Sequence, residues 1–288
     1  MFSEAVQALE SSFAQVSDAE EDRLPFAEAT REPGRPPTAD EDPYNCFIRR
    51  CTVNGKADGA LSGLNVGLKD NISVAGIPMT LGSRFMEGYV PLIDATVVTR
   101  LLNAGVNVKG KLNMDEFSHG IFGFGTDPQS YGRSLNPHAP EYLSGGSSSG
   151  PAVAVASRAV DVAFGGDQGG SIRVPASWCG IVGLKPTHGL VPHTGVIGID
   201  PVIDHIGPVG RSVMDVARIL ECIAGSDDYD RRQVGAPSAL RYASGLATGI
   251  RGVRIGVLRE GFGDEEADPD VEAVVRESIE VLKRAVPL

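Results

Sequence analysis

Two short loops rich in glycine and serine carry the residue types that acyl-transfer chemistry needs. They are residues 145–150 (GGSSSG) and 165–171 (GGDQGGS). A serine hydroxyl becomes a nucleophile when a base takes its proton, and the backbone N–H groups of consecutive glycines can converge on a developing negative charge. Glycine–serine runs are also typical of flexible linkers, so the flanking sequence decides between the two interpretations.

The flanks of both loops indicate regular structure. Pro151 follows the first loop and opens the small, apolar run 152–156, a pattern typical of the first turn of a helix. The alternation of Val160, Val162 and Phe164 predicts a short strand that leads into the second loop. Linkers do not usually run into an apolar helix and a buried strand. We therefore expect both loops at the ends of regular elements.

Two other glycine-rich motifs are alternatives for the first loop. A phosphate-binding loop would end in Gly-Lys-Ser or Gly-Lys-Thr, which is absent here. A nucleophile elbow, G-x-S-x-G, matches residues 146–150 with Ser148 at its centre. That elbow needs a strand immediately before it, whereas Pro137 and Pro140 argue against a central strand there. The elbow is the weaker alternative.

Together with residues 179–187 (CGIVGLKPT), the two loops resemble the sequence pattern of the amidase signature family, whose members hydrolyse amides with a Ser-Ser-Lys triad. The resemblance implies that Ser171, in the segment GGSIR, is the nucleophile. It also implies that Ser147, the first serine after the glycine pair of the first loop, relays the proton between this nucleophile and the base. A lone serine in a glycine loop is usually only a turn residue, so these roles depend on the joint pattern.

The same resemblance implies that Lys69, in the segment GLKDN, is the base. A lone lysine is usually solvated and protonated. Lys69 follows the apolar residues Val66 and Leu68, so we expect it to emerge from the protein interior, where burial lowers the pKa of an amine towards neutrality. A neutral lysine can take the proton that serine loses as it attacks an amide carbonyl.

The resemblance further places an oxyanion hole at the backbone of Gln168, Gly169 and Gly170, and a cis peptide bond between Gly146 and Ser147. Three further residues are expected to support the site: Ser148, Asp167 and Arg173. Gln168 stands where the family more often has threonine or isoleucine. This DQGGSIR variant is more similar to the enantioselective and nitrile-pathway amidases than to the transamidation subunits, whereas residues 110–117 (GKLNMDEF) are more similar to the latter.

Charge and composition exclude several classes of partner. The 288-residue chain has a net charge of −11, which argues against nucleic acid or an anionic membrane as a direct partner. It has no apolar run of about 18 residues and no basic region followed by an apolar one at its start, so we expect a cytoplasmic protein. The four cysteines, and His188, His193 and His205, do not have ligand spacing. We expect no metal site and no cofactor.

The periodicity along the chain predicts an α/β fold, with a mixed β-sheet sandwiched between helices, as the resemblance also implies. A strand ending at Lys69, an amphipathic helix around 97–102 and a strand from Val106 form a β-α-β unit, and hence a parallel pair.

We divide the chain into an N-terminal region, 1–45, and an amidase core, 46–288. The first contains an amphipathic helix over 2–17 and a proline-rich linker or surface arm over 31–44. Near the other end, 253–258 is predicted to be a buried strand, and Asp268 and Pro269 begin a helix. The family's sequences continue well past this point, so we expect a core that is incomplete at its C-terminal end and leaves apolar surface uncovered.

The sequence therefore predicts an amidase that hydrolyses a small carboxamide to acid and ammonia through an acyl-serine intermediate. One alternative is the catalytic A-subunit of a tRNA-dependent amidotransferase, which passes the ammonia on. Another is a truncated, non-catalytic chain that serves as a binding or assembly module. A homo-oligomer is compatible with each of these hypotheses.

Overall fold

The computed structural model describes residues 27–125, 130–235 and 238–285. The helix predicted over 2–17 lies outside the described residues. The chain divides into two compact units, one up to Leu240 and the other Arg241–Leu288. All the predicted site residues belong to the first unit, so its sheet is described first.

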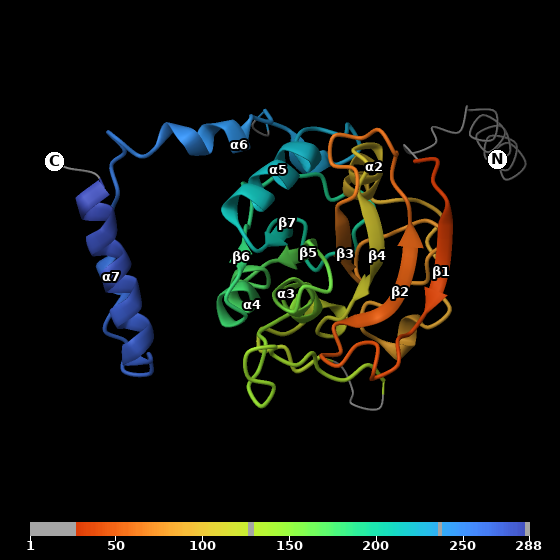
Figure 1. The fold of residues 1–288 in the computed structure, drawn as a ribbon, viewed down its shortest axis with the longest axis horizontal. Coiled ribbons are helices and arrows are strands. Elements are labelled where there is room, and N and C mark those ends of the chain that lie inside the picture. Colours follow the sequence, from red (N-terminus) through yellow and green to blue (C-terminus); the bar gives the residue numbers. More distant parts are fainter. Residues whose placement is uncertain (1–26, 126–129, 236–237, 286–288) are drawn as a thin grey trace, which may run out of the picture. The chain divides into compact units, whose positions relative to one another are not determined.

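Seven strands in the described part of the chain form one sheet, in the order β1-β2-β4-β3-β5-β7-β6 (Figure 1). β3 pairs in parallel with both β4 and β5, and the other neighbours are antiparallel. The predicted mixed sheet is confirmed. The strands are β1 (Arg31–Arg35), β2 (Phe47–Val53), β3 (Asn65–Lys69), β4 (Asn107–Leu112), β5 (Val162–Asp167), β6 (Val182–Gly183) and β7 (His205–Gly210).

The connections between the strands determine which face of the sheet each helix covers. In the described part of the first unit the helices are α2 (Thr96–Asn103), α3 (Ser149–Ala156), α4 (Arg173–Trp178) and α5 (Val213–Ile223), with one-turn helices η1 (Arg84–Met86), η2 (Glu116–Ser118) and η3 (Arg231–Gln233). The chain passes from β3 through α2 to β4, and then back through α3 to β5 on the other side of β3. Because parallel crossovers are right-handed, these two opposite directions place α2 and α3 on opposite faces of the sheet. α5 packs on α2, and α4 lies beside α3 (Figure 1).

Helix α3 is buried around its whole circumference. Its apolar residues 152–155 are alanines and valines with no exposed surface. Small side chains let the helix lie close to strands β3, β4, β5 and β7, which it contacts. The first glycine–serine loop, at the start of this helix, is therefore held by the core and is not a flexible linker.

A buried ion pair stands next to the predicted base. Lys111 Nζ, in β4, lies 2.8 Å from Asp70 Oδ1, and neither side chain is exposed. The second oxygen of Asp70 accepts hydrogen bonds from the N–H and hydroxyl of Thr80. Taking one partner from such a pair leaves an uncompensated charge in the interior.

We therefore expect Lys111→Met to lower the free energy of unfolding by about 3 to 5 kcal/mol. The control is Arg35→Met, which removes an exposed pair with Glu41 and should not change the unfolding midpoint measurably. Equal midpoints for the two variants in a denaturant titration would show that the buried pair does not stabilise the fold.

The linker predicted over 31–44 is wrong for Arg31–Arg35, which form β1, antiparallel to β2. Pro33 is tolerated because β1 is an edge strand, with one side unpaired among the residues that the structure describes. Gly34 has a φ of +59°, and a Cβ there would lie 1.9 Å from the carbonyl oxygen of Arg50, so the irregular pairing at this point requires glycine. The folded sheet thus begins before residue 46.

The second unit contains α6 (Tyr242–Gly245), α7 (Pro269–Ala285) and the one-turn helices η4 (Leu246–Thr248) and η5 (Arg259–Gly261). The helix predicted from Pro269 is confirmed. The buried strand predicted over 253–258 is wrong, because this segment pairs with no strand in the described structure and Leu258 is 71% exposed.

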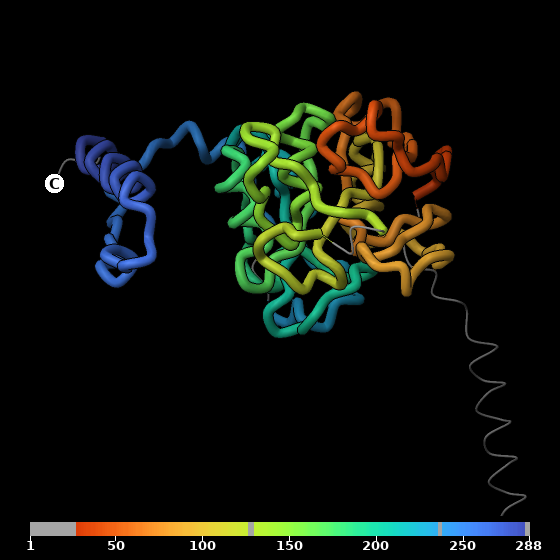
Figure 2. Tube along the Cα trace, turned by 90° about the horizontal axis from the view of Figure 1, so that it is seen from below, coloured from red at the N-terminus to blue at the C-terminus, as the bar shows by residue number. Residues whose placement is uncertain are grey.

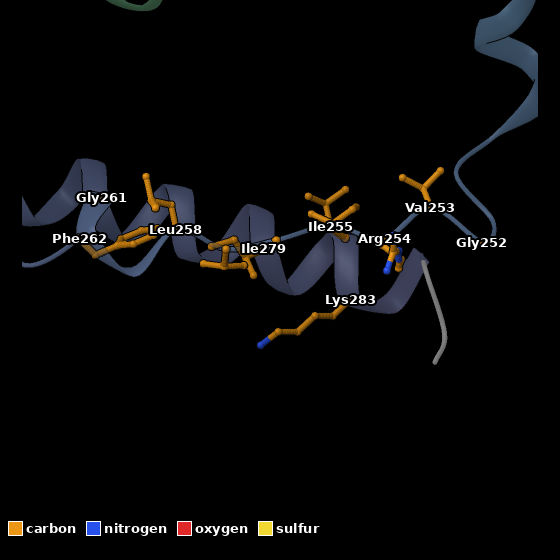
Figure 3. A pocket seen from close by; sticks show the side chains of 12 residues that line it. Gly252, Val253, Arg254, Ile255, Leu258, Gly261, Phe262, Ile279 and Lys283 are labelled. Carbon is orange, nitrogen blue, oxygen red and sulfur yellow. The ribbon is translucent and has the colours of Figure 1, made fainter.

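An apolar pocket of about 990 Å³ lies between residues 252–262 and α7 (Figure 3). Ile255, Leu258 and Phe262 line it from the extended segment, and Ile279 lines it from the helix. None of the predicted site residues takes part in it. Among the described residues, no helix has the length and apolarity needed to cross a membrane.

Candidate active site

Lys69 and Ser147 meet in the core of the first unit. Lys69 is the last residue of β3, and its Nζ donates a hydrogen bond to Ser147 Oγ across 2.7 Å. Neither residue has exposed surface. Two of the three predicted catalytic side chains, far apart in the sequence, are therefore in direct contact.

Burial lowers the pKa of Lys69 from its usual 10.5 to about 7. The nearby carboxylates of Asp115, Asp167 and Asp204 act in the opposite direction and raise it. Around neutral pH a large share of Lys69 is therefore unprotonated. A buried amine in this state can accept a proton from a hydroxyl group that it contacts.

Asp115 holds the first loop in place, and sequence reasoning assigned it no role. The peptide bond between Gly146 and Ser147 is cis, as predicted. The N–H of Asp115 donates to the carbonyl oxygen of Ser147 at 3.1 Å. Its carboxylate accepts hydrogen bonds from the backbone of Gly123 at 3.3 Å and of Gly125 at 2.7 Å. These partners lie in residues 113–125 and 130–148, between β4 and α3, which are drawn in yellow to light green in Figure 2.

The packing around Gly146 leaves no room for a side chain. A Cβ there would lie 2.1 Å from Asp115 Oδ2 and 2.6 Å from the backbone nitrogen of Gly123. We expect Gly146→Ala to displace Ser147 from Lys69, lower the free energy of unfolding by about 1 to 3 kcal/mol and abolish activity. The control is Gly245→Ala, where a Cβ would meet no atom within 4 Å. Wild-type unfolding and wild-type turnover in Gly146→Ala would contradict this close packing.

Ser148 joins the two glycine–serine loops. Its N–H donates to the carbonyl oxygen of Ser171 at 3.2 Å, and its hydroxyl donates to the carbonyl oxygen of Gly166 at 3.1 Å. Ser148 is fully buried, and no strand precedes the loop within the described residues 130–145. This environment disfavours the nucleophile elbow. Ser171 keeps 5% of its surface exposed, so it is the one of the two with access to solvent.

Asp167 belongs to the second loop and binds the backbone of the residues that follow it. Its carboxylate accepts hydrogen bonds from the backbone of Gly170 at 2.9 Å and of Ile172 at 3.1 Å, and from the Arg173 guanidinium at 2.9 and 3.0 Å. Burial by itself would raise the pKa of Asp167, but the hydrogen bonds from Arg173 and Ile172 hold it below its usual value. Asp167 and Arg173 are therefore in direct contact beside the loop, and their supporting roles in the site stay predictions.

One of the predicted oxyanion donors is already engaged. The N–H of Gly170 points to Asp167, so it does not face a substrate in this arrangement. A Cβ at Gly169 would meet no atom within 4 Å, which leaves open space beside the backbone there. The N–H groups of Gln168 and Gly169 therefore stay as the predicted donors. Within the described residues, no group of three or more His, Cys, Asp or Glu side chains could hold a metal ion.

Comparison with known proteins identifies the family of this chain. The family model described as Amidase matches residues 48–286, which is most of the chain. The chain belongs to the amidase family. The A-subunit of the glutamyl-tRNA(Gln) amidotransferase from Methanospirillum hungatei is 44% identical over 243 residues, which are 84% of this chain and 54% of that protein. Its counterpart from Lachnospira eligens is 38% identical over 97% of this chain and 56% of its own length.

Solved structures of this amidase family share the fold. The A-subunit of the glutamyl-tRNA(Gln) amidotransferase from Thermotoga maritima superposes with a TM-score of 0.76 at 35% identity, covering 85% of this chain and 53% of that one. The native peptide amidase from Stenotrophomonas maltophilia superposes with a TM-score of 0.71 at 38% identity, covering 79% and 47%. The chain thus spans about half the length of the relatives it matches.

Proposed function

We propose that this amidase-family chain cleaves the C–N bond of a carboxamide through an acyl-Ser171 intermediate. The observation that carries the proposal is the buried contact of 2.7 Å between Lys69 Nζ and Ser147 Oγ, with the pKa of Lys69 lowered to about 7. A neutral lysine in hydrogen-bond contact with a serine hydroxyl is placed to accept the proton of that hydroxyl.

The proposed reaction has two halves, acylation of Ser171 and hydrolysis of the acyl ester. Ser171 Oγ attacks the amide carbonyl carbon while its proton passes through the Ser147 hydroxyl to Lys69. The tetrahedral intermediate collapses, the C–N bond breaks, and the proton returns from Lys69 to the leaving nitrogen, which departs as ammonia or an amine. Water then attacks the acyl ester, giving the carboxylic acid and free Ser171. The N–H groups of Gln168 and Gly169 stabilise the oxyanion in both halves of the reaction.

A panel of carboxamides incubated with the purified chain tests this proposal through release of ammonia. We expect turnover in the wild-type chain and none in Ser171→Ala. A folded chain that releases no ammonia from any carboxamide would favour the alternative of a non-catalytic binding or assembly module.

The A-subunit of an amidotransferase is the second candidate, and the names of the relatives support it. The proteins that match from Methanospirillum hungatei and Lachnospira eligens both carry that name. In this function, glutamine is the amide and the released ammonia passes to an acceptor on a partner. Ammonia release from glutamine that requires the other amidotransferase subunits would favour it. Release from simple carboxamides by the chain alone would favour hydrolysis.

A further inference from the structure

Asp204 is a buried carboxylate that binds the second glycine–serine loop but belongs to a different segment of the chain. It lies just before β7 and is 5% exposed. Its Oδ1 accepts a hydrogen bond from the side-chain amide of Gln168 at 2.7 Å and another from the backbone of Ile199 at 3.1 Å. Its Oδ2 accepts from the backbone of Asp200 at 3.1 Å. Asp204 thus connects its own loop to the side chain of Gln168.

The surroundings of Asp204 hold this carboxylate in one place. A Cβ at Gly198 would lie 1.9 Å from Asp204 Oδ2, so the chain wraps closely around the carboxylate. The backbone is fixed as well, because Arg232 donates to the carbonyl oxygen of Asp204 at 3.1 Å and is itself paired with Asp230 at 2.6 Å. A group held by packing and by several hydrogen bonds can position another group accurately.

Two carboxylates therefore hold the same short segment. Asp167 binds the N–H of Gly170, and Asp204 binds the side chain of Gln168. Of the predicted oxyanion donors, the N–H of Gly169 lies in the chain between these two attachment points, and the N–H of Gln168 belongs to the residue that Asp204 binds. The direction of these N–H groups depends on both attachments, since a loop that is held at only one point can still turn about that point.

We propose that Asp204 is a positioning residue, which binds the Gln168 carboxamide and thereby directs the N–H groups of Gln168 and Gly169 towards the oxyanion. This inference rests on the function proposed above. It assigns to the Gln168 side chain a role beyond that of its backbone, namely to couple the oxyanion loop to the chain just before β7. The competing interpretation is that the Gln168–Asp204 hydrogen bond only adds stability.

A matched pair of variants separates the two interpretations. Gln168→Met keeps the length of the side chain but removes the donor to Asp204. Gln233→Met is the control, because the Gln233 carboxamide is also buried and donates to the carbonyl oxygens of Gly189 at 2.7 Å and Gly225 at 3.2 Å. We expect Gln168→Met to lower kcat by about 10- to 100-fold, with KM changed by less than about threefold, because small misplacements near the reacting atoms have effects of this size. Gln233→Met should lower the melting temperature and leave kcat unchanged.

A charge exchange gives a second, independent test. Gln168→Glu places a carboxylate against Asp204, so the bridge is lost and like charges repel. In the double variant with Gln168→Glu and Asp204→Asn, the amide group at position 204 can again bridge to position 168 in the reverse order, at the cost of the hydrogen bond that Asp204 Oδ1 accepts from the backbone of Ile199. We expect the double variant to recover at least about tenfold of the kcat lost in Gln168→Glu. An unchanged kcat in Gln168→Met overturns the positioning role.

The rate at which a fluorophosphonate modifies Ser171 separates this inference from the proposed function. If the wild-type chain is labelled at Ser171 but hydrolyses no carboxamide, the proposed function fails and the bridge is still tested by the labelling rate. We then expect labelling of Gln168→Met to be at least about tenfold slower than that of Gln233→Met, and equal rates would overturn the bridge. A folded chain with neither turnover nor labelling contradicts both proposals.

Discussion

Ser171→Ala is expected to abolish amide hydrolysis. The substitution removes the hydroxyl that forms the acyl ester, and loss of the nucleophile in a serine protease, which also forms an acyl-serine, lowers kcat on the order of a millionfold. Because Ser171 is small and lies in a loop held by Asp167 and Ser148, the alanine variant should fold as the wild type does. The measurement is ammonia release from the best carboxamide of the panel.

The control for this variant is Ser177→Ala, the same substitution at an exposed position of α4. It should keep the wild-type rate. Equal rates of ammonia release from Ser171→Ala and Ser177→Ala would show that Ser171 is not the nucleophile.

Lys69→Met is expected to lower kcat by about 10²- to 10⁴-fold, the usual contribution of a general base. Methionine occupies the same buried space without the amine. The wild-type enzyme should also respond to pH in a defined direction. Since burial lowers the pKa of Lys69 to about 7, its neutral form predominates above pH 7 and its protonated form below. Only the neutral form accepts a proton, so kcat/KM should fall about tenfold per pH unit as the pH drops below about 7.

The exposed Lys56 provides the control, and Lys56→Met should change neither the rate nor its dependence on pH. The assay must include a check of folding at each pH, so that acid unfolding is not mistaken for titration. A kcat/KM that is constant from acid to alkaline pH in the folded enzyme would count against Lys69 as the base.

Much of the first unit could be predicted from local patterns. The alternating residues around Lys69 and Val162 predict strands, and the apolar face over 97–102 predicts the helix that makes the β3–β4 pair parallel. These signals are strong because both the period and the burial are encoded in neighbouring residues. The resemblance to the amidase signature family then identified Lys69 and Ser147, which the fold brings into contact.

The errors arose where a segment's structure depends on distant partners. Arg31–Arg35 contains a proline and charged residues, which are typical of a linker, yet it adds to the edge of the sheet because β2 offers unpaired backbone groups. The apolar residues 253–258 fit a buried strand, but burial requires covering residues, and the described second unit provides only α7 beside them.

The acidic residues around the site could not be assigned from the sequence for a related reason. Asp115 and Asp204 bind backbone N–H groups and a side chain that converge only in the folded chain. A single aspartate in a loop carries no local signal of such a role, since most are solvated. The same limit applies to Gly170, whose N–H was predicted to face the substrate and instead binds Asp167.

The most direct test of Ser171 as the nucleophile is to treat the purified 288-residue chain with a serine-reactive fluorophosphonate and to locate the adduct by peptide mass mapping. We expect one adduct, at Ser171, and labelling that slows as the pH falls below about 7 with protonation of Lys69. An adduct at Ser148 would support the nucleophile elbow in its place. No adduct in a chain that is shown to be folded would contradict the claim that Lys69, Ser147 and Ser171 form an active nucleophilic site.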